Sequence, residues 1–201
     1  CLSWEKFTGL DFERRFGEEV RKRSSDIDPD DLVTIIYTSG TTGESKGAML
    51  THSSFLYTFS IHDERLDVRE SDVSVSFLPL SHVFERMWTY YMLYKGATNV
   101  FIDNPREIIN HISVIKPTLM CTVPRFFEKT FEGIQSEKEK WSDGKKKIFD
   151  WSVKTGEEYS VCLSRKQKPS FSLKLKRSIA DILVLKKLRK IFGGKIRYMP
   201  C

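Results

Sequence analysis

The stretch YTSGTTGESKGAML (37–50) contains six consecutive residues that are all Thr, Ser or Gly, and Lys46 follows them closely. It continues LVTIIY (32–37), a β-branched run of strand length that predicts a buried strand. Glycines let a backbone approach a ligand, hydroxyls donate hydrogen bonds, and lysine adds a positive charge. A plain flexible turn needs neither the lysine nor the preceding strand. The stretch therefore predicts a phosphate-binding loop, for which a triphosphate is the natural ligand.

The loop differs from the P-loop of the common nucleoside triphosphatases. That motif reads G-x-x-x-x-G-K-[ST], and its last hydroxyl binds magnesium. Here Ser45 precedes Lys46 and Gly47 follows it, so the second glycine and the hydroxyl of that motif are both missing. The phosphate-binding prediction points to another family.

The loop closely resembles the signature of adenylate-forming enzymes, the superfamily of acyl-CoA synthetases, luciferases and peptide-synthetase adenylation domains. The usual form is [Tyr/Phe]-Thr-Ser-Gly-[Thr/Ser]-Thr-Gly-x-Pro-Lys-Gly, and this chain departs from it at Ser45, where proline is usual. Further segments are similar to those of the long-chain fatty acyl-CoA synthetases and follow in the same order. They are LPLSHVFER (78–86), TVPRFFEK (122–129) and GGKIRY (193–198).

This resemblance implies a two-step ligase reaction on a fatty acid. The carboxylate attacks the α-phosphate of ATP to give an acyl-adenylate and pyrophosphate, and the sulfur of coenzyme A then displaces AMP. Such chemistry depends on positioning and charge neutralisation. The resemblance implies that Lys46 is catalytic and that Thr38 also contacts Mg²⁺. The implied phosphate cradle consists of Thr38, Ser39, Gly40, Thr41, Thr42, Gly43 and Lys46.

The segment LPLSHVFER supplies the second group of candidate residues. His82 follows a predicted strand and a Pro-Leu turn, a place where α/β sheets present ligand-binding groups. By resemblance, His82 is catalytic and lies near the acyl carboxylate and the adenylate, while Phe84 lines the acyl path. The structural alternative is that His82 satisfies the end of a helix. Glu85 and Arg86 are expected to form a structural ion pair.

The order of the elements predicts an α/β fold with a mostly parallel sheet flanked by helices, because strands and helices alternate through residue 123. Residues 1–30 are expected to form a lead-in helix and connector, and 31–201 the central part of the AMP-binding N-terminal domain. The predicted strands are 32–37, 73–77, 97–101, 118–123 and one beginning at KIRYM (195–199). The predicted helices are 11–23, 53–66, 83–94, 104–115 and a long basic region over 125–190 with breaks near 142–144 and 166–170.

Apolar residues at helical spacing fill the predicted helix 83–94, and they are expected chiefly to pack in the core, with an acyl tunnel as the alternative. The four cysteines form no CxxC pair, which favours reduced thiols over a zinc site or a disulfide framework. Nothing at the N-terminus resembles a signal peptide. We therefore expect a cytoplasmic protein.

The charge is distributed unevenly. Residues 1–100 carry 11 Lys and Arg against 16 Asp and Glu, whereas residues 101–201 carry 22 against 11. The basic tract 138–197 predicts a solvated surface first and peripheral contact with a membrane second. Nucleic acid is not an expected partner, because the aromatic residues of the tract have spacings suited to helix packing.

The chain begins at Cys1 without an initiator methionine and stops within an apolar run, so both ends are expected to be cuts. Two elements of the resembled family do not occur in it, the Tyr-Gly-x-Thr-Glu segment and the C-terminal domain with its catalytic lysine. We therefore expect a segment of a longer ligase that is inactive by itself. The alternatives are a ligase for another carboxylic acid and a non-catalytic nucleotide-binding or scaffold fragment.

Overall fold

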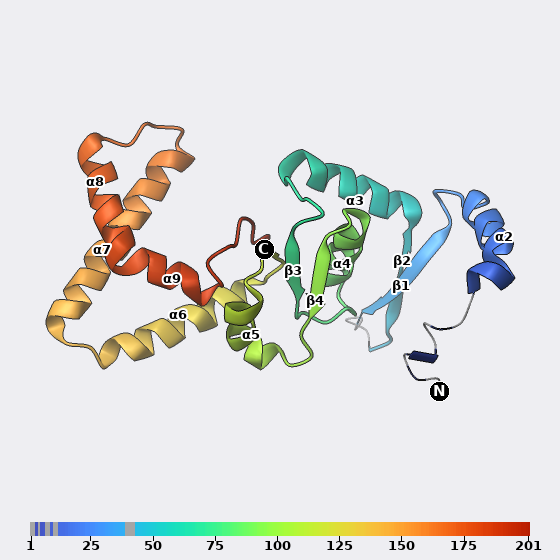
Figure 1. Cartoon of the computed structure of the whole chain (residues 1–201), viewed down its shortest axis with the longest axis horizontal. Coiled ribbons are helices and arrows are strands. Elements are labelled where there is room, and N and C mark those ends of the chain that lie inside the picture. The colour runs from blue at the N-terminus through green and yellow to red at the C-terminus, as the bar shows by residue number, and fades with distance from the viewer. Residues whose placement is uncertain (1–2, 4, 7–8, 10–11, 39–42) are drawn as a thin grey trace. The chain divides into compact units, whose positions relative to one another are not determined.

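The computed structural model describes residues 3, 5–6, 9, 12–38 and 43–201. The chain divides into two compact units, Cys1–Glu64 and Arg65–Cys201, whose elements are labelled in Figure 1. In the described residues, the first unit contains a two-stranded sheet and the second a three-stranded sheet. The α/β character predicted from the sequence is confirmed.

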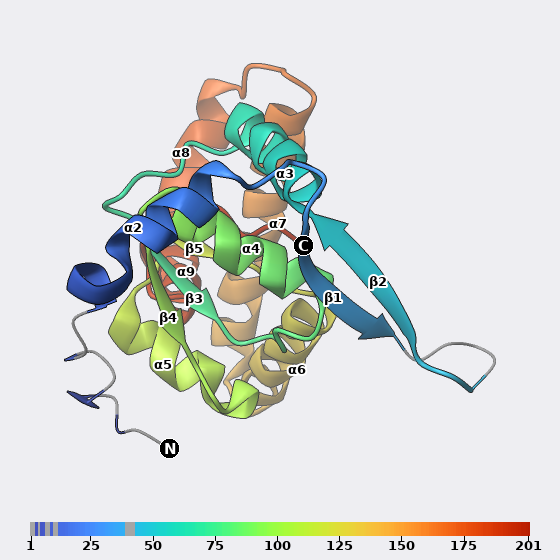
Figure 2. The same ribbon diagram turned by 90° about the vertical axis from the view of Figure 1, so that its right-hand side faces the viewer.

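The first unit is built around a β-hairpin. Helix α2 (Phe12–Ser25) precedes strand β1 (Leu32–Thr38), which pairs antiparallel with β2 (Lys46–Thr51), and helix α3 (His52–Arg65) follows at once. Figure 2 shows β1 and β2 as two neighbouring arrows that point in opposite directions. The two helices and β1 were predicted from the sequence, but β2 was not. The prediction that β1 is a buried strand is wrong, because Ile36 is buried whereas Leu32, Ile35 and Tyr37 are exposed.

Strand β2 is difficult to recognise because KGAMLT lacks the alternation and the β-branched residues typical of a strand. It forms as the partner of β1, and glycine allows the close pairing. A Cβ atom on Gly47 would lie 2.8 Å from Cγ2 of Ile35 and 3.4 Å from the ring of Tyr37. The side chains of β1 therefore occupy the space above Gly47.

The second unit contains the predicted parallel sheet. Its strands β3 (Val73–Ser76), β4 (Thr98–Phe101) and β5 (Leu119–Met120) are arranged in the order β4-β3-β5, and both pairings are parallel. Helix α4 (Val83–Tyr94) connects β3 to β4. The 3₁₀ turn η1 (Pro105–Glu107) and helix α5 (Ile108–Ile115) connect β4 to β5. The sequence correctly predicted these βαβ units. The helical segment predicted from residue 104 begins with Asn104 as the N-cap of η1, and its side chain accepts a hydrogen bond from the Arg106 N–H.

Beyond β5, the sheet is extended by only a few backbone hydrogen bonds to the last residues of the chain. Strand β5 is shorter than the predicted 118–123, and the predicted strand at KIRYM is limited to one parallel bridge between Leu119 and Tyr198. The Met120 N–H donates to the carbonyl oxygen of Tyr198 over 3.2 Å, and the Thr122 N–H donates to that of Pro200 over 2.9 Å. The last residues therefore run alongside β5 with only part of a strand ladder.

The core of the second unit lies between the sheet and its helices. Helix α4 buries Trp88, Tyr91 and Met92 almost completely, and the Trp88 Nε1–H donates to Oγ of Ser74 over 2.8 Å. The prediction that most apolar residues of this helix belong to the core is confirmed for these three. Another buried cluster consists of Val75, Phe77, Ile108, Ile112, Met120 and Phe126.

The region after β5 is helical, as predicted. It comprises α6 (Pro124–Glu139), α7 (Asp143–Ser164), α8 (Phe171–Ala180), the π-helical turn η2 (Asp181–Leu185) and α9 (Lys186–Ile191). Breaks separate α6 from α7 and α7 from α8 at the predicted positions, and Gly193 and Gly194 follow α9 with positive φ angles of 79° and 75°. No helix in the described part of the chain has both the length and the apolar composition needed to cross a membrane.

Candidate functional site

The β1–β2 hairpin brings the two ends of the phosphate-loop signature together. Thr38 is the last residue of β1, Lys46 is the first of β2, and the two are paired in the strand register. The Thr38 hydroxyl donates to the carbonyl oxygen of Lys46 over 3.4 Å. Both residues are exposed. The signature is thus a hairpin loop whose ends carry a hydroxyl on one strand and an ammonium group on the other.

The remaining loop candidates are only partly described. Ser39, Gly40, Thr41 and Thr42 lie outside the described residues. Gly43 has a φ of +90°, a conformation that L side chains rarely adopt, and open space surrounds the position of a hypothetical Cβ atom. The backbone at Gly43 is therefore accessible to a ligand.

Lys46 is suited to neutralise an anion. Within the described ranges no carboxylate forms an ion pair with it, whereas several other basic residues are paired, such as Arg23 with Glu19 and Arg125 with Glu128. A lysine on an exposed strand end without such a partner keeps its full charge for a ligand.

His82 caps α4 with its backbone rather than with its side chain. Its φ and ψ of −91° and 137° are extended, its carbonyl oxygen accepts from the Arg86 N–H over 3.1 Å, and its imidazole makes no capping hydrogen bond. The side chain is exposed. The structural alternative, a histidine side chain that satisfies the helix end, is therefore not observed. Its role in substrate binding stays a prediction.

Phe84 lies in the first turn of α4 and is 38% exposed, and its neighbour Val83 is 48% exposed. These two differ from Trp88, Tyr91 and Met92 further along the helix, which are buried. An exposed aromatic ring beside His82 is available to contact an apolar substrate.

The expected ion pair between Glu85 and Arg86 is wrong. Consecutive helical residues point about 100° apart, and here Glu85 is completely buried while the Arg86 Nε–H donates to the carbonyl oxygen of Leu80 over 2.8 Å. The Ser76 hydroxyl and the Leu78 backbone lie near the Glu85 carboxyl group, yet neither carboxyl oxygen has a partner with hydrogen-bonding geometry. Burial raises the pKa of Glu85.

The buried carboxyl group predicts a pH effect on stability. Because the pKa of Glu85 is higher in the folded than in the unfolded chain, folding favours its protonated form, and stability falls as pH rises from the unfolded pKa towards the raised folded pKa. Glu85→Gln replaces it with a neutral side chain of similar shape. We expect the variant to be more stable than the parent at pH 7, with the difference shrinking as the pH approaches 4. Urea unfolding at several pH values measures this, and a variant less stable than the parent at pH 7 would contradict it.

The described residues contain no cluster of three or more His, Cys, Asp or Glu side chains, and Cys121, Cys162 and Cys201 are free thiols. Mg²⁺ prefers oxygen ligands and commonly uses substrate phosphates together with one or two protein groups. The exposed hydroxyl of Thr38 is a protein oxygen of that kind at the phosphate loop.

A family model described as AMP-binding enzyme matches residues 3–196 of the chain. The chain belongs to the AMP-binding enzyme family. Long chain acyl-CoA synthetase 3 of Arabidopsis thaliana is 35% identical to this AMP-binding chain over 204 residues, which cover 97% of the chain and 28% of the relative. Long-chain-fatty-acid–CoA ligase FadD15 of Mycobacterium tuberculosis is 32% identical over 89% of the chain and 30% of the relative.

Solved structures also match this AMP-binding chain in part. ATP-bound MatB from Rhodopseudomonas palustris is 30% identical, with a TM-score of 0.45 over 52% of this chain and 21% of that one. In the sequence comparisons, the chain spans less than a third of the length of the two curated relatives.

The sequence identified the two candidate segments but missed two features of them. No sequence pattern marked β2 as a strand, and the segment stood out only as the residues between the loop and helix α3. The burial of Glu85 could have been predicted from helical spacing, because residue 85 lies three positions before Trp88 and therefore on the same buried face of the helix.

Proposed function

We propose that this chain is part of an AMP-forming ligase that activates a long-chain fatty acid with ATP and transfers it to coenzyme A. The observation that carries the proposal is the 35% identity to a long-chain acyl-CoA synthetase over nearly the whole chain. The hairpin geometry at Thr38 and Lys46 supports it, because the two strand ends carry a hydroxyl and a lysine that has no ion-pair partner among the described residues.

The proposed first step brings a carboxylate to a triphosphate, so the chain has to offset the repulsion between two anions. Lys46 lowers the charge on the β- and γ-phosphates, and the loop from Thr38 to Gly43 holds them with hydroxyl and backbone N–H donors. The bound Mg²⁺ would supply further charge neutralisation, with Thr38 as its protein ligand. His82 orients the acyl carboxylate and the adenylate, and Phe84 contacts the acyl chain.

Acid-dependent ATP–pyrophosphate exchange by the full-length protein tests the proposal. The panel should run from acetate to palmitate and include benzoate and several amino acids. We expect exchange to be supported by long-chain acids and to fall at least tenfold for acetate, because the apolar chain contributes about 0.8 kcal/mol for each buried methylene group. Exchange with an aromatic or amino acid instead would assign another ligase of this family. Silence across the panel, with ATP still bound, would favour the non-catalytic alternative.

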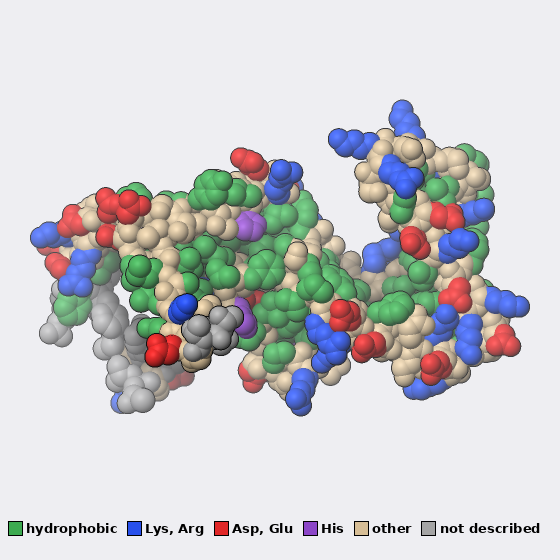
Figure 3. Space-filling model, turned by 180° about the vertical axis from the view of Figure 1, so that it is seen from behind, with side chains coloured by type: hydrophobic (Ala, Val, Ile, Leu, Met, Phe, Trp, Pro, Cys, Tyr) green, Lys and Arg blue, Asp and Glu red, His purple; other side chains and the backbone are tan. Residues whose placement is uncertain are grey.

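We also propose that the protein is cytoplasmic and contacts a membrane surface through the basic second half. Figure 3 shows basic and acidic side chains mixed over the helical region on the face in view. Helix α8 supports the proposal more specifically, since Phe171, Leu175 and Ile179 form a stripe at four-residue spacing and are 84%, 55% and 44% exposed. Lys174 and Lys176 lie on the same helix. Apolar residues combined with lysines on one helix are typical of interfacial helices, and sedimentation with anionic compared with neutral vesicles tests the contact.

A further inference from the structure

A basic pocket lies in the second unit, and three of its lining residues belong to the GGKIRY segment (193–198). Its volume is about 530 Å³, within the range of small-ligand sites. No carboxylate lines it, whereas five of its lining residues are cationic. The lining residues are Ser113, Lys116, Lys186, Arg189, Lys190, Gly193, Gly194 and Lys195.

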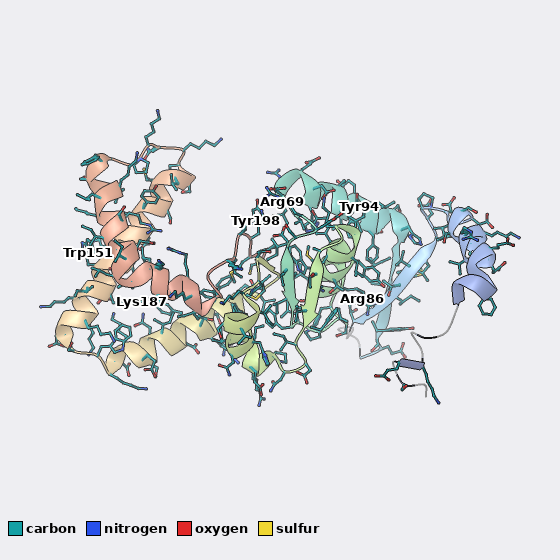
Figure 4. The ribbon with its side chains drawn as sticks, viewed as in Figure 1. Arg69, Arg86, Tyr94, Trp151, Lys187 and Tyr198 are labelled. Carbon is teal, nitrogen blue, oxygen red and sulfur yellow. The ribbon has the colours of Figure 1, made fainter. Side chains whose placement is uncertain are left out.

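The pocket forms where the end of α5 meets the end of α9. Lys116 follows α5 in a left-handed conformation with a φ of 52°. Gly193 follows α9, and a Cβ atom there would lie 2.8 Å from both the Ile112 carbonyl oxygen and the Lys116 Cα. The two backbones are therefore in close contact, which only glycine permits. This contact brings together lysines that are about 70 residues apart in the sequence and that line one pocket. Lys187, labelled in Figure 4, lies on α9 beside the pocket residue Lys186.

The positive charge of the pocket is mostly uncompensated. Arg189 is paired, since its guanidinium lies 2.7 Å from Oδ1 of Asp181 and also donates to Oδ2 over 2.8 Å. The four lysines of the pocket form no ion pair with any described residue. Convergent cations on a concave surface repel one another and create a positive potential that attracts a multiply charged anion.

The partial negative charges at the C-termini of α5 and α9 are too small to balance the cations of the pocket. Each helix C-terminus carries at most about half a negative charge, and the last carbonyls of these two helices already accept hydrogen bonds from the N–H groups of Lys116, Gly193 and Gly194. One or two lysines would therefore balance both helix ends. No aromatic side chain lines the pocket, so it lacks the stacking surface used to bind nucleic-acid bases.

We propose that this pocket binds a multiply phosphorylated group, either a soluble polyphosphate or the phosphorylated headgroup of a lipid. Lysine and arginine form strong charge-assisted hydrogen bonds with phosphate oxygens, and one phosphate would leave several of the five cations unmatched. The site is separate from the proposed ligase site, because no lining residue belongs to the phosphate loop or to LPLSHVFER. The proposal is therefore independent of the proposed function.

Titration calorimetry with inositol hexakisphosphate tests the pocket in the full-length protein. A Lys46→Ala background reduces binding at the phosphate loop. We expect one saturable site whose dissociation constant rises at least tenfold in Lys186→Glu/Lys190→Glu. The matched control, Lys147→Glu/Lys154→Glu, makes the same change of net charge on exposed positions of α7 and should alter it less than twofold. Equal weakening by both double variants, or the absence of saturable binding, would overturn the proposal.

Two additions make the result decisive. Lys195→Glu lies on the turn outside the helices, so it tests the pocket even if the double variant on α9 melts at a lower temperature, and it should weaken binding at least threefold. Vesicles containing a phosphatidylinositol bisphosphate distinguish the sources of phosphate. Sedimentation that inositol hexakisphosphate inhibits supports a lipid headgroup, whereas binding of the soluble probe without sedimentation supports a soluble polyphosphate.

Discussion

Replacing Lys46 with alanine is expected to slow acid-dependent ATP–pyrophosphate exchange by the full-length protein about 100-fold, which corresponds to ~2.7 kcal/mol of transition-state stabilisation. Lys46 stands at the first position of β2, exposed and without a carboxylate partner among the residues described. In the proposed reaction, its charge would offset that of the triphosphate most strongly when the attacking carboxylate approaches. Alanine keeps the strand but removes that charge.

Two control variants accompany this experiment. One keeps a positive charge at position 46, and the other removes a lysine elsewhere in the chain. Lys46→Arg retains a cation and should lose less activity than Lys46→Ala, while Lys174→Ala on the exposed face of α8 should leave exchange unchanged. An unaltered melting temperature for Lys46→Ala would exclude unfolding as the cause. If Lys46→Ala and Lys174→Ala exchanged at the same rate, the phosphate loop would not use this lysine.

Replacing Asp72 with alanine is expected to lower the free energy of unfolding by about 2 kcal/mol. The Asp72 side chain is 5% exposed and forms an ion pair with Arg197, whose side chain is 32% exposed. The Thr118 hydroxyl donates to its Oδ1 over 2.7 Å and the Arg69 N–H to its Oδ2 over 2.9 Å. Alanine would remove the carboxylate that accepts from all three donors, while Arg197 and Thr118 would keep their hydrogen bonds to the carbonyl oxygens of Asp67 and Val73. Figure 4 labels Arg69 and Tyr198 near this cluster.

The same carboxylate predicts the direction of a pH effect. Burial raises the pKa of Asp72, but the hydrogen bonds from Thr118 and the Arg69 backbone, together with the charge of Arg197, outweigh it and lower the pKa. A lowered folded pKa gives stability that is fully present above the unfolded pKa of about 3.9 and is lost as pH falls through the folded value. The difference in stability between the parent and Asp72→Ala should therefore shrink in acid.

Urea unfolding of the two proteins from pH 7 to pH 3 measures both effects of Asp72. Asp67→Ala is a suitable comparison, because Asp67 contacts Arg69 and Arg197 at an exposed position, where ion pairs contribute little. Its effect should be much smaller than that of Asp72→Ala. Equal effects at the two positions would show that burial of Asp72 contributes nothing.

Local sequence patterns predicted most of the elements because their signals lie within one segment. The β-branched run before the loop, the helical spacing of α4 and the Asn104–Pro105 start are examples, and each was found close to its predicted position. Strand β2 depends instead on pairing with β1, and β5 and the segment after Gly194 depend on each other. The segment KGAMLT carries no periodic strand signal of its own, and the local patterns of 118–123 and 195–199 do not show how few of their residues pair.

The candidate site shows the same division between local and distant information. The loop signature and His82 were visible as motifs, whereas the side-chain environment of Glu85 depends on Ser76 and on the helix packing around it. The charge of the second half was visible as composition. Its convergence on a pocket required Lys116 and Lys195 to meet through the contact between α5 and the turn after α9.

The hydrogen bond between Arg197 and Asp72 can form only when nearly the whole second unit has been synthesised. These residues are 125 positions apart in the chain. At the usual synthesis rate of about 5–20 residues per second, Asp72 is made roughly 6–25 s before Arg197. Until the last part of that interval ends, the edge of β5 that later meets the final segment has no partner. A nascent chain therefore has to keep this edge from pairing elsewhere, which makes the interval a natural point for chaperone binding.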